Sequence, residues 1–487
     1  MNASRRPPAL FAAFLLVLGS LLGLLPNPAK AATSAAASDT AATLARIRSA
    51  AMASPWAMQQ LTTLTDTIGP RISGSPQLDA AIEQVAAAMR ALGAQVRLQP
   101  AKVPHWVRGA EQAELTDYPG RPAGLSQRLH VTALGFSGAT APEGLNARVV
   151  VVQDFAELQR RASEVPGSIV LFDEHFEQHL ADNGDAFEAY GHAVQYRSGG
   201  AAKAAALGAR AALVRSVGGA DYRLPHTGVT VFKDAQSAIP AGALSAEDAD
   251  LLARLAAQGP VTMKLLLTPA MLPDADSNNV IADWPGREKP GEVVIVSGHL
   301  DSWDLGTGAI DDGVGTMAAA GVIAVLRQLN LHPRRTIRFI AWSSEENGGA
   351  GSRAYFESVR DRLDTQVAAI ESDAGAGRSL GVNAAVAPRS QATLQPVIDA
   401  LAPIGATALA RFDRELGADI GPLQGAGVPG FAPRVDGRHY FDYHHTAADT
   451  LDKVDPQNLN SQVATMAVLA YFLADLPDPL PRFKVAE

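Results

Sequence analysis

The sequence predicts an α/β fold with a mixed, largely parallel sheet flanked by helices, interrupted by a second, inserted domain. The chain has 487 residues, which is too long for one small core and favours two domains. From residue 278 onwards, short apolar runs alternate with helical patterns, as is typical of a parallel sheet covered on both faces. Residues 126–267 show a different pattern, with several strand-like runs and few helices.

The composition is that of a globular, acidic protein. Hydrophobic residues make up 47% of the chain, charged residues 19%, and the formal net charge is −9. Basic runs are absent from the sequence, so we expect no nucleic-acid partner. The chain also has no cysteine, which excludes disulfides and a lipid anchor on an N-terminal cysteine. Any metal site must therefore use His, Asp and Glu side chains.

The N-terminus has the pattern of a secretory signal peptide over residues 1–31. Arg5 and Arg6 precede an apolar run at 9–25, and the Ala-Lys-Ala sequence at 29–31 fits the small-residue cleavage rule. A retained membrane anchor is the alternative, but a spanning helix needs about 20 apolar residues, and this shorter run contains two glycines and a serine. We therefore expect a secreted or periplasmic protein without stable membrane insertion after cleavage.

Residues 32–125 are expected to begin the first domain, which residues 268–487 complete. Apolar residues recur at helical spacing over 78–92, and Gly93 suits the end of that helix. A short strand is expected at 95–98. After the insert, the pattern predicts strands at 292–296, 336–341 and 366–370, with helices at 313–329, 352–359 and 458–473.

The middle region, residues 126–267, is expected to fold as a unit of its own. Its strand-like runs lie at 148–152, 168–172, 211–214 and 261–267, with helices near 201–207 and after Ser245. No group of chemistry-bearing side chains stands out in it. We expect His192, His226 and Asp173 to be surface or packing residues rather than metal ligands.

Metal-binding side chains follow three successive strands of the main sheet. His299 comes just after the strand that ends at 296, Glu345 and Glu346 follow the strand that ends near 341, and Asp373 follows the strand that ends at 370. In an open parallel sheet, ligands bind outside the carboxyl ends of the strands. These side chains are therefore expected at one edge of one sheet.

Two further candidates have ordinary explanations when each is taken alone. Asp311 and Asp312 precede Gly313 at the start of a helix, where Asp is a common N-cap. His445 lies in a polar loop before the last helix, and a lone loop histidine seldom binds metal. The chelators at the three strand ends favour a ligand role for Asp311 and His445 as well.

The motifs themselves resemble those of a known family. The runs SGHLDSWDLGTGAIDDGVG, AWSSEENGGAGS, ESDAG and YHHTAADT, in this order and spacing, are similar to those of the co-catalytic di-zinc aminopeptidases. The earlier run IGPRISGSP resembles the opening of that family's catalytic domain, and residues 126–267 stand where its members carry a protease-associated domain. The resemblance covers nearly all of the mature chain, strongly over 278–450 and weakly over 126–267.

The resemblance implies two zinc ions per chain. Asp311 would bridge both ions, His299 and Asp373 would complete one site, and Glu346 and His445 the other. Each ion then has three protein ligands, which matches catalytic zinc with a position open for water. The oxygen and imidazole donors favour zinc but leave manganese and cobalt open.

The resemblance also implies roles for the residues around the ligands. Glu345 is expected to be the general base that takes a proton from the attacking water. Asp301 and Asp449 are candidates for accepting the second ring N–H of the two histidine ligands. His444 stands where relatives have Tyr, and it is a candidate substrate contact. A homodimer is a further possibility by resemblance.

The expected reaction is hydrolysis of a peptide bond next to a free terminus, with short peptides, especially dipeptides, as substrates. The insert enters before the metal-bearing strands, so we expect it to cover the cleft and favour small substrates. A substrate carboxylate then needs a basic partner, for which Arg434 and Arg438 are candidates.

Three alternative functions remain open at this point. One is a general aminopeptidase that trims longer peptides. The second is a single-zinc acyltransferase of the glutaminyl cyclase kind, and the third is a non-catalytic binding protein like the transferrin receptor ectodomain. The full set of five ligands together with Glu345 argues against the last two.

Overall fold

A computed structural model describes residues 28–219 and 221–485, with side chains from residue 38 onward except that of Ala235. The chain divides into one unit, Met1–Thr43, and a second unit, Leu44–Glu487. In the first unit the described residues belong to helix α1 (Pro28–Ala53), which continues into the second. Of the predicted signal peptide, residues 1–27 lie outside the described residues. The second unit contains both sheets of the protein.

The first sheet has eight strands, in the order β1 (Gln95–Val107), β10 (Ala270–Trp284), β12 (Arg335–Trp342), β11 (Lys289–His299), β13 (Gln366–Glu371), β16 (Gly430–Val435), β14 (Ser379–Ala385) and β15 (Ala408–Arg411). The four central strands, β12, β11, β13 and β16, run parallel to one another. Strands β1, β10 and β14 pair in antiparallel fashion with β10, β12 and β16. The prediction of a mixed α/β sheet is confirmed.

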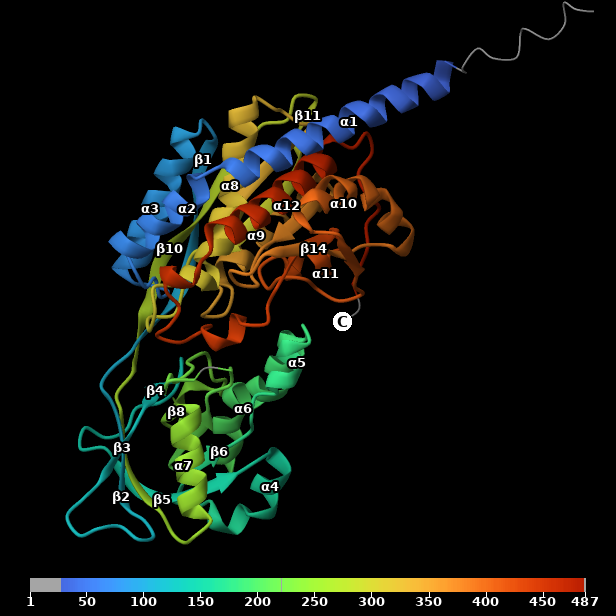
Figure 1. The fold of residues 1–487 in the computed structure, drawn as a ribbon. Helices are drawn as coiled ribbons and strands as arrows, with labels where there is room; N and C mark the ends of the chain where they lie inside the picture. Colours follow the sequence, from blue (N-terminus) through green and yellow to red (C-terminus); the bar gives the residue numbers. More distant parts are fainter. Residues whose placement is uncertain (1–27, 220, 486–487) are drawn as a thin grey trace, which may run out of the picture. The chain divides into compact units, whose positions relative to one another are not determined.

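Helices cover both faces of this sheet, because alternate residues of its strands face different cores. Val294 and Val296 of β11 join the core that contains α8 and α12, whereas Val293 and Ile295 join the core that contains Tyr355 of α9. The helices of the sheet are α2 (Trp56–Thr67), α3 (Pro76–Ala91), α8 (Val314–Leu329), α9 (Ala350–Val359), α10 (Gln395–Leu401), α11 (Gly421–Gly425) and α12 (Pro456–Asp475) (Figure 1).

Within the described residues, one helical segment, Ala309–Leu329, is long and apolar enough to cross a bilayer. It is 94% buried inside the fold over its most apolar window. Burial against the sheet and α12 therefore accounts for its composition.

The second sheet also has eight strands, in the order β3 (Gln127–Leu129), β2 (Glu111–Asp117), β9 (Thr262–Leu267), β5 (Leu145–Val152), β6 (Ile169–Phe172), β7 (Ala211–Arg215), β8 (Ala241–Leu244) and β4 (Val131–Ala133). Its helices are α4 (Phe155–Arg160), α5 (Gln178–Asp182), α6 (Ala186–Ala206) and α7 (Ala246–Ala256). This sheet has its own apolar cores on its two faces. It begins at Glu111, earlier than the boundary at residue 126 that the sequence predicts.

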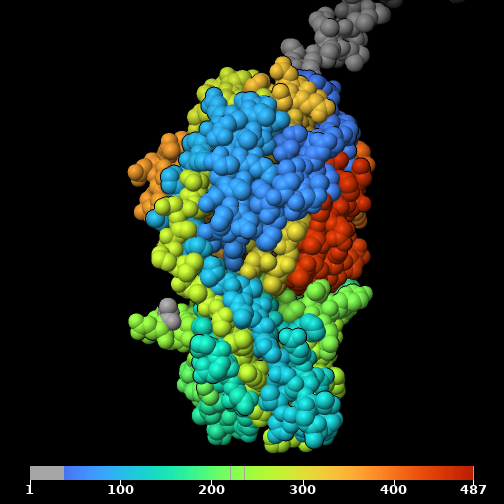
Figure 2. Space-filling view, turned by 90° about the vertical axis from the view of Figure 1, so that its left-hand side faces the viewer, coloured from blue at the N-terminus to red at the C-terminus, as the bar shows by residue number. Residues whose placement is uncertain are grey.

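Two long strands lead from the first sheet into the second and back. Strand β1 runs directly toward β2, and β9 is followed almost at once by β10. Strands β1 and β10 pair in antiparallel fashion along their length. Gln95 lies opposite Asp283 at one end, and Val107 lies opposite Ala270 at the other. Figure 2 shows them side by side on one face of the molecule, β1 in blue to cyan and β10 in yellow-green.

Candidate metal centre

Three adjacent strands bring metal-binding side chains to one edge of the first sheet. His299 is the last residue of β11, Glu345 and Glu346 follow the end of β12, and Asp373 follows the end of β13. Because β11 pairs in parallel with both β12 and β13, their carboxyl ends meet at this edge. The structure therefore gathers the side chains that the sequence analysis singled out.

The first group of possible metal ligands consists of His299, Asp311 and Asp373. Their ligand atoms all lie within 4.8 Å of one another. His299 Nε2 is 3.1 Å from Asp311 Oδ1 and 3.8 Å from Asp373 Oδ1. The hydroxyl of Tyr440 donates a hydrogen bond to Asp373 Oδ1 at 3.4 Å.

The second group, Asp311, Glu346 and His445, shares Asp311 with the first. His445 Nε2 lies 3.1 Å from Asp311 Oδ2 and 3.0 Å from Glu346 Oε2. Within the described part of the chain, Asp311 Oδ2 and Glu346 Oε1 are buried without a hydrogen bond of suitable geometry. Buried oxygens of this kind are costly unless a cation binds them. The carboxylate and imidazole donors of these groups fit divalent metal ions such as zinc.

Two neighbouring carboxylates fix the loop that carries Asp311. Asp312 accepts hydrogen bonds from the backbone N–H of His299 at 3.1 Å and of Gly315 at 3.0 Å, so it ties the start of α8 to β11. Asp449 accepts from the N–H of Ile310 at 2.7 Å and of Asp311 at 3.2 Å. The expectation that Asp449 serves His445 is wrong, because His445 Nδ1 lies 3.2 Å from the backbone carbonyl oxygen of Thr227 and the Asp449 carboxylate holds the Asp311 loop instead.

The Asp301 carboxylate does not accept the second ring N–H of His299, contrary to the expectation. The ring nitrogen His299 Nδ1 lies 2.9 Å from the backbone carbonyl oxygen of Asp301, while the Asp301 carboxylate is 3.8 Å away. That carboxylate instead accepts hydrogen bonds from the backbone N–H of Glu345 at 3.0 Å and of Glu346 at 3.2 Å. Asp301 thus fixes the His299 tautomer through its carbonyl and holds the Glu345–Glu346 turn through its side chain.

Burial dominates the electrostatics of the paired glutamates. It raises the pKa of Glu345 well above its ordinary value, and the nearby carboxylates of Glu346 and Asp373 add to this effect. Burial also raises the pKa of Glu346 to about 7. The indole N–H of Trp303 donates to Glu346 Oε2 at 2.6 Å and orients that carboxylate. A cation at the centre would favour the ionised forms.

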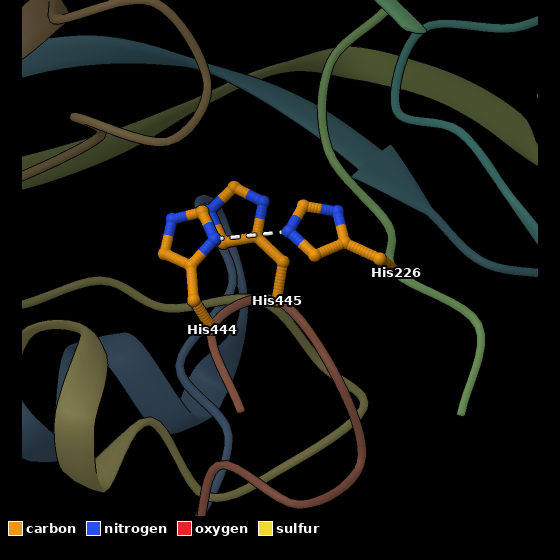
Figure 3. A group of neighbouring side chains, drawn as sticks. All are labelled: His226, His444 and His445. Atoms are coloured by element: carbon orange, nitrogen blue, oxygen red, sulfur yellow. Dashed lines mark hydrogen bonds between the residues drawn. The ribbon is translucent and has the colours of Figure 1, made fainter. Parts of the chain in front are cut away.

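A segment from the second sheet completes the centre. The carbonyl oxygen of Thr227 lies 3.2 Å from His445 Nδ1, and the Thr227 N–H donates to the His445 carbonyl at 2.9 Å. His226 is fully buried, with its Nε2 3.0 Å from Nδ1 of His444 (Figure 3). Burial lowers the pKa of both His226 and His444 well below the ordinary value, which favours the neutral form of each ring.

The sequence predicts His226 as a surface or packing residue rather than a ligand, and it is a buried residue that packs against His444, with the unforeseen role of linking this segment to the centre. No residue pattern around it signals this role, since the contact joins positions 218 residues apart. The other two residues of that expectation are placed as predicted: His192 is exposed, and Asp173 is buried against Arg215 at 3.2 Å.

A cavity of about 370 Å³ opens over both groups of ligands. Residues from the two sheets share its wall. The second sheet and its helices contribute Phe187, Tyr190, Arg197 and Val229, and the first sheet and its loops contribute Asp311, Glu345, Glu346, Gly348, Asp373, Tyr440, Phe441, His444 and His445.

The wall of this cavity contains an arginine, Arg197, which the sequence analysis did not single out. Arg434 and Arg438, the predicted carboxylate partners, are both exposed and absent from the wall, and Arg438 pairs with Asp436 at 2.7 Å. Arg197 is only 8% exposed. Its Nη1 donates to the hydroxyl of Tyr190 at 2.6 Å, its Nε has no partner, and it forms no ion pair with any described residue.

The residues that form this site lie in a part of the chain that is similar to known peptidases. Residues 279–470, which include both groups of ligands, match the sequence profile of Peptidase family M28. Carboxypeptidase Q of Homo sapiens is 37% identical over 429 residues, which cover 87% of this chain and 86% of that protein. Carboxypeptidase Q of Xenopus laevis is 38% identical over 426 residues, with 87% of each chain covered.

A solved structure is similar over almost the whole chain. The Peptidase M28 precursor from Shewanella amazonensis SB2B has a TM-score of 0.86 and 34% sequence identity, and the match covers 92% of this chain and 99% of that chain. The sequence relatives and this structure span both sheets. The chain therefore belongs to peptidase family M28 and is a metallopeptidase.

Proposed function

We propose that the chain is a di-zinc exopeptidase that hydrolyses short peptides, above all dipeptides. The observation that carries this proposal is the pair of ligand groups that share Asp311 and open onto one cavity with Glu345 in its wall. A structural metal site would be closed by four ligands, whereas three ligands leave a position for water and substrate.

The five ligands would hold the ions in the order that the two groups suggest. Asp311 would contact both ions, with His299 and Asp373 on one side and Glu346 and His445 on the other. Zinc bound there supplies a more acidic water and polarises the peptide carbonyl. The Thr227 carbonyl beside His445 Nδ1, at 3.2 Å, keeps Nε2 of that ring free to bind metal.

Glu345 is the proposed general base. It belongs to neither ligand group, yet it lines the same cavity, and Asp301 holds its backbone N–H at 3.0 Å. Glu345 takes a proton from the attacking water and passes it to the leaving amine. A pKa raised by burial suits a group that must hold this proton between the two transfers.

Arg197 supports the preference for dipeptides. Its guanidinium is buried in the cavity wall without an ion pair among the described residues, so a bound carboxylate would neutralise it. The C-terminal carboxylate of a short peptide fits this chemistry while the scissile bond lies at the ligand groups. A longer peptide would carry its carboxylate out of the cavity.

The test compares a dipeptide, its C-terminal amide and a hexapeptide with the same first residue. We expect kcat/KM for the amide and the hexapeptide to fall at least about 10-fold, since a charge-assisted hydrogen bond contributes about 1.5–3 kcal/mol. Arg197→Met should remove the preference, whereas Arg438→Met, at an exposed arginine, should leave it unchanged. Equal cleavage of all three substrates by the wild-type chain would identify a general aminopeptidase.

We also propose the domain organisation and the export of the chain. The sequence places the boundaries at 125 and 268, and the start of β2 moves the first one, so that residues 32–110 and 268–487 form the catalytic domain and residues 111–267 form an insert of the protease-associated kind. The separate sheet and cores of this segment support the division. Cleavage of the signal peptide would leave a mature chain that begins near Ala32, which N-terminal sequencing of exported protein can test. Retention of Arg5 in a membrane fraction would contradict export.

A further inference from the structure

His226 links the second sheet to the metal centre through two buried imidazoles (Figure 3). Its Nε2 lies 3.0 Å from His444 Nδ1, and the other ring nitrogen of His444, Nε2, lies 3.2 Å from Asp311 Oδ2. His226 is 0% exposed and His444 is 7% exposed, so bulk water does not replace the contact between them. One side of the His444 ring therefore faces His226, and the other faces the metal centre.

The surroundings fix His226 firmly. Its backbone N–H donates to the hydroxyl of Ser216 at 2.9 Å, directly after β7. Tyr190 packs against both imidazoles, with ring centroids 5.9 Å from His226 and 5.3 Å from His444. Ring stacking at 3.6 Å between His444 and the ligand His445 fixes the other face of His444. The two imidazoles are thus held in a defined geometry.

The protons of the pair have one favourable arrangement. If His226 Nε2–H donates to His444 Nδ1, the proton of His444 lies on Nε2, which is 3.2 Å from Asp311 Oδ2 but makes no hydrogen bond of suitable geometry with it. The reverse arrangement would place a proton on His226 Nδ1, a buried atom that has no partner among the described residues. It would also turn a lone pair of His444 toward the Asp311 carboxylate. Buried N–H groups without an acceptor are rare, so the first arrangement is favoured.

We propose that His226 is a positioning residue for peptide hydrolysis. The Nε2–H of His226 holds the His444 ring so that the Nε2–H of His444 is directed into the cavity. There the His444 N–H donates to the carbonyl oxygen of the bound peptide as negative charge develops on it. This inference rests on the proposed function, in which His444 contacts the substrate. It gives the second sheet a part in catalysis besides closing the cavity.

Two variants at this position separate positioning from packing. His226→Leu removes the donor, whereas His226→Gln keeps an N–H near the place of Nε2. In zinc-loaded full-length protein, we expect the Leu variant to lose about 10- to 100-fold in kcat with KM nearly unchanged, and the Gln variant to lose far less. Both should keep the zinc content of the wild type. Equal losses in the two variants, or loss of zinc, would overturn the inference.

A double-mutant cycle tests whether His226 acts through His444. In a His444→Leu background, His226→Leu should have almost no further effect on kcat, because residues that act through one another are not additive. Full additivity of the two losses would contradict the inference.

NMR of the zinc-loaded chain with ¹⁵N-labelled histidine gives a readout that needs no activity. Protonation of His226 and His444 on Nε2 supports the inference, and protonation on Nδ1 overturns it. If the wild-type chain cleaves no peptide, the proposed function fails, and the tautomers still decide the hydrogen-bond arrangement.

Discussion

Replacing each of the two neighbouring glutamates by glutamine should separate catalysis from metal binding. Glu346 belongs to a ligand group, with its Oε2 3.0 Å from His445 Nε2 and 2.6 Å from the indole nitrogen of Trp303. Glu345 belongs to no such group and lines the cavity. Glutamine has nearly the same shape as glutamate, so the two variants change the charge and the proton affinity with little effect on packing.

Glu345→Gln should lose turnover while it keeps its metals. The variant retains the backbone hydrogen bond to Asp301 at 3.0 Å, so the turn keeps its conformation. Removal of a general base lowers kcat by about 10²- to 10⁴-fold, which corresponds to about 3–5 kcal/mol in the activation free energy. The zinc content should remain at about two ions per chain, as three ligands are still present for each ion.

Glu346→Gln should instead lose metal. The change removes the charge from one of three donors in the group Asp311, Glu346 and His445. An amide oxygen is a weaker zinc ligand than a carboxylate, so the zinc content should fall from about two toward about one per chain.

Elemental analysis of both variants after dialysis, together with dipeptide hydrolysis followed by chromatography, measures the two effects separately. Asp361→Asn, at an exposed acid, is the matched control and should resemble the wild type in both assays. If Glu345→Gln lost zinc and Glu346→Gln kept it with little turnover, the two roles would have to be exchanged.

Two further predictions concern the metal-free chain. Dialysis against a chelator should abolish peptide hydrolysis and added zinc should restore it; full activity in protein shown to be metal-free would contradict the metal assignment. Burial raises the pKa of Glu346, and of the buried Asp419 just before α11, to about 7, so the metal-free folded chain holds protons that the unfolded chain has released. Its stability should therefore fall by about 1 kcal/mol per group between about pH 6.5 and 8.5, seen as a lower Tm, and a rising Tm would refute this.

The sequence was most informative where apolar strands end in chelating residues. Strands β11, β12 and β13 are short apolar runs, and His299, Glu346 and Asp373 stand at or after their carboxyl ends. The rule that parallel strands deliver ligands to one edge was therefore enough to predict which residues meet. Asp311 and His445 needed the resemblance to the family, because each also fits an ordinary role in a loop or helix cap.

Strand β10 was missed because its first half carries no strand signal. Residues 270–275 contain Pro273 and Asp274 and are exposed or partly exposed in the structure, so no apolar alternation marks them. The part of β1 beyond residue 98 was also missed, because it too carries no clear strand signal. Pairing of β1 with β10, rather than burial of one face, forms these strands.

The partners of polar side chains could not be predicted from sequence spacing. Asp301 lies two residues from His299, yet its carboxylate bonds to the backbone of Glu345 and Glu346. Arg197 and His226 reach the centre from the second sheet, and their surroundings exist only after both sheets have formed. Spacing along the chain gives proximity, but the direction of each side chain depends on tertiary packing.

In the proposed function, five residues hold two metal ions that share Asp311. Crystals of zinc-loaded protein, measured on both sides of the zinc absorption edge, test it directly through the anomalous difference map. We predict two peaks, one among His299, Asp311 and Asp373 and the other among Asp311, Glu346 and His445, each about 2 Å from its ligand atoms. A single peak, or peaks that do not contact Asp311, would contradict it.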